Sequence, residues 1–200
     1  HVGDSVAQVR KGGDAKIFAY VHAAVAELNE RTATSARKDL FNYAMADGYA
    51  RMAGKPAFTL LHVGSGFANG IANLHNAGRG NTPVVNIVGA NASYHQPNFP
   101  EHELVGGKIT ELARAVSHWT REAKSAAEMG LLGAEAVSQA AVGCGRISTL
   151  IAPTNCHWDP APDAPASVEP APTPQVSATT VSNIASLLGN GKRTGLLLGT

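Results

Sequence analysis

The residues best suited to chemistry lie in one short stretch that follows an apolar run. His62 closes the run, and Gly64, Ser65 and Gly66 come directly after it. An imidazole exchanges protons near neutral pH, and backbone N–H groups at the start of a helix can receive an anion or the polar edge of a ring. Further along, three amides share one face of the expected helix: Asn69, Asn73 and Asn76. The stretch therefore predicts a polar site where a strand passes into a helix.

A dinucleotide-binding turn is one alternative for this stretch. Gly64 and Gly66 could be the first two glycines of a G-x-G-x-x-G turn, but Asn69 stands at the third position. About twenty residues further on, where an acidic residue would bind a ribose, the sequence has Asn91 instead. The match is incomplete, and a turn that merely packs a helix against a strand is a second alternative.

Short apolar runs alternate with alanine-rich stretches of helical spacing. Predicted strands cover residues 16–21, 57–63, 83–88, 147–152 and 194–198. Predicted helices cover residues 22–30, 39–52, 67–78, 105–116, 125–142 and 176–188. Because the strand runs are apolar on both faces, the pattern predicts an α/β fold in which a parallel sheet is covered by helices on both faces.

The composition argues against several classes of function. The 200 residues carry 16 Lys and Arg against 15 Asp and Glu, with no basic block, which argues against nucleic acid as a partner. No apolar run approaches the ~18 residues of a membrane span, and residues 1–4 do not resemble a signal peptide, so a cytoplasmic protein is expected. Charged residues make up 16%, which favours a surface covered by other subunits. Cys144 and Cys156 form no CxxC pair, and free thiols are expected.

A proline-rich segment divides the chain. Six prolines lie between residues 159 and 174, and such a segment forms a semi-rigid linker because it continues neither a helix nor a central strand. The expected organisation is a first domain over residues 1–158, a linker over residues 159–175, and the beginning of a second α/β domain over residues 176–200. One helix and one strand cannot bury a core alone, so the chain is expected to be a fragment of a longer protein.

Three segments together resemble a known family. Residues 46–56 are Ala-Asp-Gly-Tyr-Ala-Arg-Met-Ala-Gly-Lys-Pro, residues 69–77 are Asn-Gly-Ile-Ala-Asn-Leu-His-Asn-Ala, and residues 82–89 are Thr-Pro-Val-Val-Asn-Ile-Val-Gly. In this order and spacing they resemble the N-terminal, pyrimidine-binding domain of thiamine-diphosphate-dependent enzymes, and most of all the acetolactate-synthase-like group. The resemblance is dense from residue 44 to residue 95 and looser over residues 112–119 and 148–153.

The resemblance implies a cofactor held between two subunits. In this family the pyrimidine-binding domain holds the aminopyrimidine ring of thiamine diphosphate, while the C-terminal domain of a partner chain holds the diphosphate and Mg²⁺. The resemblance therefore implies a homodimer or homotetramer that acts on a 2-oxo acid by carboligation or decarboxylation. No stretch of this chain resembles the family's Mg²⁺-binding segment, so the metal is expected outside it.

The resemblance also implies roles for individual residues. The family's ring-contacting carboxylate is a Glu eight residues before the Asp of its motif, and counting back from Asp47 gives Asp39. A helix N-cap is the alternative role for Asp39. A His at the place of His62 relays protons in relatives that resemble benzoylformate decarboxylase, and a hydrogen-bonded strand-end His is the alternative. The expected cofactor-binding positions are Gly64, Ser65, Gly66, Asn69 and Asn73.

Two residues are candidates for contact with the substrate, and two other functions are open as alternatives. Tyr94 and His95 follow a predicted strand, near where ligands gather in open α/β sheets, which favours contact with substrate. Residues 101–103 have no metal-ligand spacing, and no metal site is expected in this chain. The residues before Ala46 depart from the family pattern, so a non-catalytic binding or assembly subunit is one alternative function. A nucleotide-binding flavodoxin-like module is the other.

Overall fold

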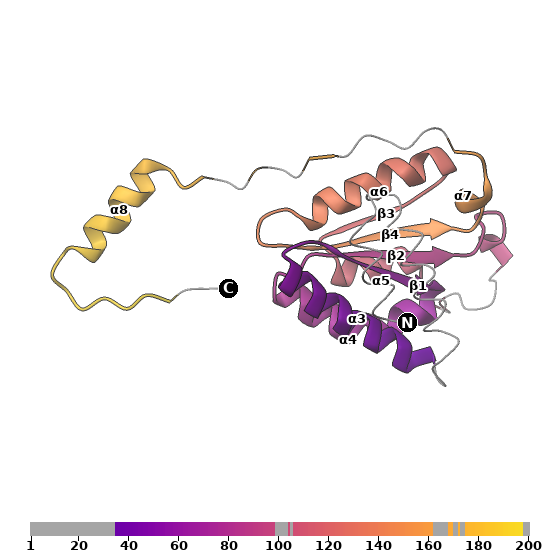
Figure 1. The fold of residues 1–200 in the computed structure, drawn as a ribbon, viewed down its shortest axis with the longest axis horizontal. Coiled ribbons are helices and arrows are strands. Elements are labelled where there is room, and N and C mark those ends of the chain that lie inside the picture. The colour runs from indigo at the N-terminus through magenta and orange to yellow at the C-terminus, as the bar shows by residue number, and fades with distance from the viewer. Residues whose placement is uncertain are drawn as a thin grey trace.

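A four-stranded parallel sheet organises the chain (Figure 1). The computed structural model describes residues 35–98, 104, 106–161, 168–169, 172 and 175–197. The strands are β1 (Ala57–His62), β2 (Val84–Ala90), β3 (Trp119–Glu122) and β4 (Ile147–Pro153), and they lie in the order β1-β2-β4-β3. The predicted α/β class is confirmed, while the strand and helix predicted over residues 16–30 lie outside the described residues.

Helices connect the strands in chain order. α3 (Ser35–Ala53) precedes β1, and α4 (Val63–Arg79) joins β1 to β2. α5 (Ile109–Val116) joins β2 to β3, and α6 (Ala126–Ala140) joins β3 to β4. The remaining elements are η1 (Gln96–Asn98), α7 (Asn155–Trp158) and α8 (Ala178–Leu188).

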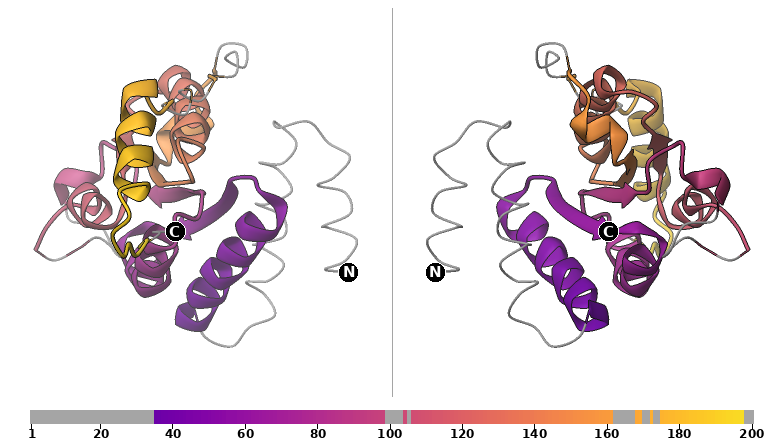
Figure 2. Two further views of the ribbon diagram at one scale, coloured as in Figure 1. Left: turned by 90° about the vertical axis from the view of Figure 1, so that its left-hand side faces the viewer. Right: turned by 90° about the vertical axis from the view of Figure 1, so that its right-hand side faces the viewer.

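The two faces of the sheet are covered by different helices, as predicted. α3, α4 and α5 contribute to one apolar core, which contains Phe67 and Leu74 of α4. α6 and α7 contribute to the other core, which contains Leu150 of β4 and Cys156. Figure 1 shows α6 above the sheet and α3 and α4 below it, and the side views of Figure 2 show the same layers. Both central strands are therefore covered on both faces, which explains why nearly all their residues are buried and most are apolar.

A row of polar side chains crosses the sheet on the face covered by α4. Thr59 donates a hydrogen bond through Oγ1 to Oδ1 of Asn86 at 2.8 Å, and Asn86 donates through Nδ2 to Oγ1 of Thr149 at 2.9 Å. The row ends at Ser117, whose hydroxyl lies 2.7 Å from that of Thr149. Asn86 is fully buried. Because these partners meet only in the observed register, the row helps to fix the pairing of β1, β2 and β4.

Replacing Asn86 by Leu is expected to destabilise the protein by about 2 kcal/mol, because the buried hydroxyl of Thr59 loses its acceptor and that of Thr149 loses its donor and keeps only Ser117. Leucine has a similar volume, so loss of packing contributes little. Urea unfolding measures the effect. The triple variant Thr59→Val, Asn86→Leu, Thr149→Val should recover most of the loss, since the buried polar groups are removed together and only the partly exposed hydroxyl of Ser117 must turn to water. A triple variant no more stable than the single one would contradict this role.

Two predicted elements differ in the structure. The sequence did not predict β3, because Trp-Thr-Arg-Glu is not an apolar run, and only its first two residues are buried at this sheet edge. The strand predicted over residues 194–198 is absent from its described part, since residues 193–197 are in neither a helix nor a strand. A strand needs a hydrogen-bonded neighbour, whereas every residue from 175 to 197 is exposed.

Candidate functional site

The carboxyl ends of the parallel strands meet at one edge of the sheet. His62, the last residue of β1, pairs in register with Gly89 near the end of β2. The loop that follows β2 therefore begins beside His62. In this loop the exposed rings of Tyr94 and His95 meet edge to face, with centroids 4.5 Å apart. The structure thus brings the predicted residues His62, Tyr94 and His95 to one edge, the edge at which ligands bind in open α/β sheets.

The junction between β1 and α4 corrects one prediction. The helix begins at Val63, earlier than the predicted residue 67, so residues 64–66 form its first turn rather than a separate glycine turn. The left-handed residue at the junction is Val63, with φ of 49°, and not a glycine. Such a conformation costs a β-branched residue about 1–2 kcal/mol. No loop connects β1 to α4, because the backbone changes direction at Val63 and the strand is followed directly by the helix.

The first turn of α4 offers several hydrogen-bond donors. The first N–H groups of a helix have no acceptor within the helix, and the side chain of His62, the N-cap residue, does not cap them. Gly64 and Gly66 are buried, while His62 and Ser65 are exposed. Asn69 and Asn73 lie half-buried further along α4. Backbone N–H groups, a hydroxyl and an imidazole can together hold the nitrogen-bearing edge of a flat ring and move a proton beside it.

Asp39 lies inside α3, which is already helical from Ser35. The alternative role of helix N-cap is therefore wrong, because an N-cap residue precedes the first helical turn. The side chain of Asp39 is outside what the structure describes, so its contact with a cofactor stays a prediction.

Asp47, from the segment that carries the family resemblance, has a structural role. Its Oδ1 accepts hydrogen bonds from Oγ1 of Thr82 at 2.6 Å and from Nε of Arg51 at 2.9 Å. Thr82 is buried just before β2 begins, so these contacts tie α3 to the amino edge of the sheet, opposite His62. Asp47 of this segment therefore stabilises the scaffold. The spacing of residues within the segment gave no sign of the pairing with Thr82.

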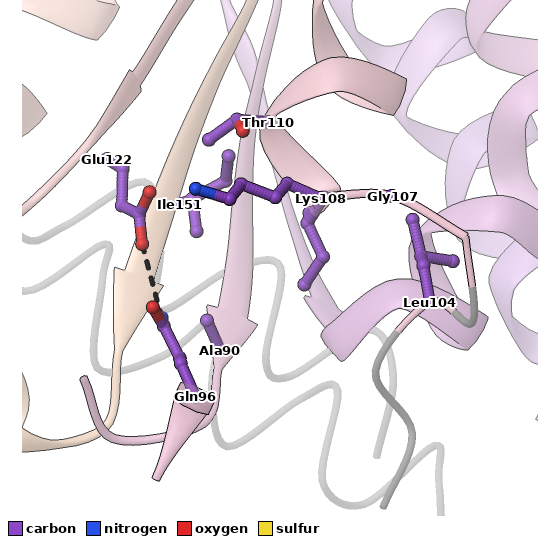
Figure 3. Close-up of a pocket in the computed structure, with 9 residues that line it drawn as sticks. Ala90, Gln96, Leu104, Gly107, Lys108, Thr110, Glu122 and Ile151 are labelled. Atoms are coloured by element: carbon purple, nitrogen blue, oxygen red, sulfur yellow. Dashed lines mark hydrogen bonds between the residues drawn. The ribbon is translucent and has the colours of Figure 1, made fainter. Parts of the chain in front are cut away.

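A pocket of about 220 Å³ opens at the carboxyl edge, between the ends of β2 and β4 (Figure 3). Its polar lining includes Gln96, Lys108 and Glu122. The sequence assigned no function to these residues, since they are far apart in the chain and match no motif. Only the fold brings them together.

The family match supplies the identification. Residues 5–117 match the family described as thiamine pyrophosphate enzyme, N-terminal TPP binding domain. The chain belongs to this family. Over 155 residues it is 40% identical to IlvX of Mycobacterium tuberculosis, provisionally named an acetolactate synthase large subunit; the match covers 77% of this chain and 29% of that protein. Over 149 residues it is 30% identical to benzoylformate decarboxylase of Pseudomonas aeruginosa, covering 74% of this chain and 27% of that protein.

Solved structures of thiamine-diphosphate enzymes have the same fold. The 4-hydroxybenzoylformate decarboxylase of Rhodococcus jostii RHA1 superimposes with a TM-score of 0.64 at 20% identity, over 73% of this chain and 28% of that one. Benzoylformate decarboxylase of Polynucleobacter necessarius gives 0.66 at 19% identity, over 78% of this chain and 28% of that one. This thiamine pyrophosphate enzyme domain thus spans less than a third of the length of these relatives. The nucleotide-binding and non-catalytic alternatives are not favoured by these matches.

The described ranges of this domain contain neither a cluster of metal ligands nor a membrane-spanning helix. Within them, no three His, Cys, Asp or Glu side chains gather in a way that could hold a metal ion. None of the helices described there is both long and apolar enough to cross a bilayer. Cys144 is an exposed free thiol and Cys156 a buried one, and burial raises the pKa of the Cys156 thiol.

Proposed function

We propose that this chain is the pyrimidine-binding part of a thiamine-diphosphate-dependent enzyme that acts on 2-oxo acids, by acetolactate-synthase-like carboligation or by decarboxylation. The proposal rests on the geometry of the junction between β1 and α4, in a chain that belongs to this family. There the strained residue Val63 places His62 beside the uncapped N–H groups of the first turn of α4. Strain of this kind persists where the surrounding structure enforces it and is concentrated at functional sites.

The donors at this junction fit the polar edge of an aminopyrimidine ring. When bound, thiamine diphosphate supplies the nucleophilic carbon and the electron sink for decarboxylation. The N–H groups of residues 64–66 and the Ser65 hydroxyl hold the ring edge, with Asn69 and Asn73 supporting it from α4. Asp39 holds a proton at the ring nitrogen N1′, and His62 moves a proton at the reacting end. Tyr94 and His95 contact the substrate from the loop after β2.

The rest of the enzyme lies outside the pyrimidine-binding domain of residues 1–158. Residues 159–175 link this domain to a central α/β domain that begins at residues 176–200, and α8 is its first helix. The diphosphate and Mg²⁺ are bound by a further domain of a partner subunit, in a homodimer or homotetramer located in the cytoplasm. This arrangement is supported by the exposure of residues 175–197, whose apolar side chains include Val181, Ile184 and Leu187. Such side chains need a covering layer.

Calorimetric titration of the full-length protein with thiamine diphosphate and Mg²⁺ tests the proposal. We expect saturable binding of about one cofactor per chain, followed by CO₂ release when a 2-oxo acid is added. Analysis of the organic product then separates carboligation from simple decarboxylation. Absence of saturable heat would exclude the cofactor, and binding without turnover of any 2-oxo acid would favour the non-catalytic assembly subunit.

Replacing Asp39 by Asn tests the carboxylate assignment. Asparagine keeps the size of the side chain but cannot exchange a proton with the ring, so turnover in the full-length protein should fall about 100-fold or more. Asp39→Glu, which restores the residue usual in the family, should keep activity. The measurement is the rate of 2-oxo acid consumption at saturating cofactor. Equal rates for Asp39→Asn and the unaltered protein would remove Asp39 from the mechanism.

A further inference from the structure

The pocket between the ends of β2 and β4 lies where the chain connections diverge. The connection after β2 runs to α5, on the face that α4 also covers. The connection after β4 runs to α7, which packs with α6 on the opposite face. Neighbouring parallel strands whose connections leave to opposite faces open a crevice at their carboxyl ends, and this is the general ligand position in open α/β sheets. Ala90 of β2 and Ile151 of β4 line the crevice.

The walls of the pocket combine an apolar side with two opposite charges. Leu104 and Ile109 join Ala90 and Ile151 on the apolar side. Figure 3 shows the Lys108 side chain extending across the pocket toward Glu122. Within the part of the chain that the structure describes, these two charged groups form no ion pair with each other.

The acidic side of the pocket is held in place by a hydrogen bond. Nε2 of Gln96 donates to Oε1 of Glu122 at 3.2 Å, which links the loop after β2 to the end of β3. On the other side, Glu111 turns back to accept from the backbone N–H of Lys108 at 3.3 Å and so fixes the start of α5. The carboxylate and the ammonium therefore project into the pocket from separate, anchored elements.

We propose that this pocket binds a small α-amino acid with an apolar side chain. The ligand carboxylate pairs with Lys108, its ammonium pairs with Glu122, and its side chain packs on the apolar wall. A volume of about 220 Å³ suits a ligand of this size, because it lies below the ~300–1,000 Å³ of sites for drug-sized molecules. None of the lining residues belongs to the predicted cofactor site, so the proposal does not depend on the proposed enzyme activity.

Nuclear magnetic resonance of the ¹⁵N-labelled chain, titrated without cofactor, tests the proposal. L-leucine should give saturable shifts at the amides of Gly107, Lys108 and Thr110. Two analogues each lack one charge: 4-methylpentanoate has no ammonium and 3-methylbutylamine has no carboxylate. Each should bind at least tenfold more weakly, since hydrogen bonds to charged groups are the strong ones. No saturable shift with leucine, or equal affinity for either analogue, would overturn the proposal.

Two variants assign the charges. Lys108→Met keeps the aliphatic stem, and Glu122→Gln keeps an acceptor for Gln96, so each removes only one charge. Each variant should weaken leucine binding at least tenfold. Lys108→Met should leave the affinity for 3-methylbutylamine unchanged, because this analogue has no carboxylate. Glu122→Gln should leave the affinity for 4-methylpentanoate unchanged, because this analogue has no ammonium. The control is Lys55→Met, an exposed residue in the turn before β1, which should bind as the unaltered chain does. If Lys108→Met or Glu122→Gln keeps full affinity for leucine, the zwitterion site is excluded.

Discussion

Replacing Gly70 by Ala is expected to destabilise the protein by about 3 kcal/mol, because a Cβ atom at this position would overlap the ring of Tyr43. Gly70 lies in the middle of α4, where Ala normally stabilises a helix by up to about 1 kcal/mol relative to Gly. Here α3 packs so closely on α4 that the ring occupies this space. Tyr43 is only 1% exposed and cannot swing away into solvent. The free energy of unfolding in urea measures the effect.

A matched control lies on the neighbouring helix. Gly48 of α3 is exposed, and a Cβ added there would meet nothing within 4 Å. Gly48→Ala should therefore stabilise the protein by up to about 1 kcal/mol. Adding Tyr43→Leu to Gly70→Ala should restore part of the lost stability, since leucine has no ring to collide with the new methyl group. If Gly70→Ala and Gly48→Ala change stability equally, the close packing of α3 on α4 is wrong.

Replacing His62 by Ala should lower turnover of a 2-oxo acid by about 100-fold or more in the full-length protein, because general acid–base groups contribute at least that much. Cofactor affinity should stay nearly unchanged, since the N–H groups of the first turn of α4 are untouched. The measurements are the steady-state rate and calorimetric titration with thiamine diphosphate. His62 is exposed at the end of β1, so added free imidazole should restore part of the rate.

The control for this experiment is His75→Ala. His75 is an exposed histidine on α4, beyond the first turn, and its loss should leave the rate within about twofold, as a surface position with no role in proton transfer allows. If His62→Ala retains full activity, His62 is only a strand-end residue. If it loses cofactor affinity instead of rate, its contribution is to binding and not to proton transfer.

The local sequence predicted most of the sheet because buried parallel strands are apolar on both faces. β2 and β4 were found this way, and their bounds differ from the predicted ones by a residue or two. β3 was missed because an edge strand needs less apolar surface, and its Trp119 is held by a hydrogen bond from Nε1 to Glu135 at 3.0 Å rather than by an apolar run. The predicted first strand lies outside the described residues.

The candidate site divides in the same way between local and tertiary information. The candidate residues His62, Ser65, Asn69 and Asn73 were predicted from their types, their spacing and the family resemblance, which are local properties of the chain, and their roles stay predictions. The left-handed residue at the start of α4 is Val63 and not one of the glycines. Residue type alone could not give this result, because the direct passage from strand to helix imposes the backbone conformation.

The sequence by itself determined the family and the alternation of strands and helices, and it predicted the candidate site around His62, because each of these depends on residues close together in the chain. Only the tertiary structure decided what distant residues do together. It paired Asp47 with Thr82 at the amino edge, 35 positions apart. It also placed Lys108 and Glu122 across one pocket at the carboxyl edge. Strand order sets these pairings, and strand order follows from how α5 and α6 cross opposite faces of the sheet.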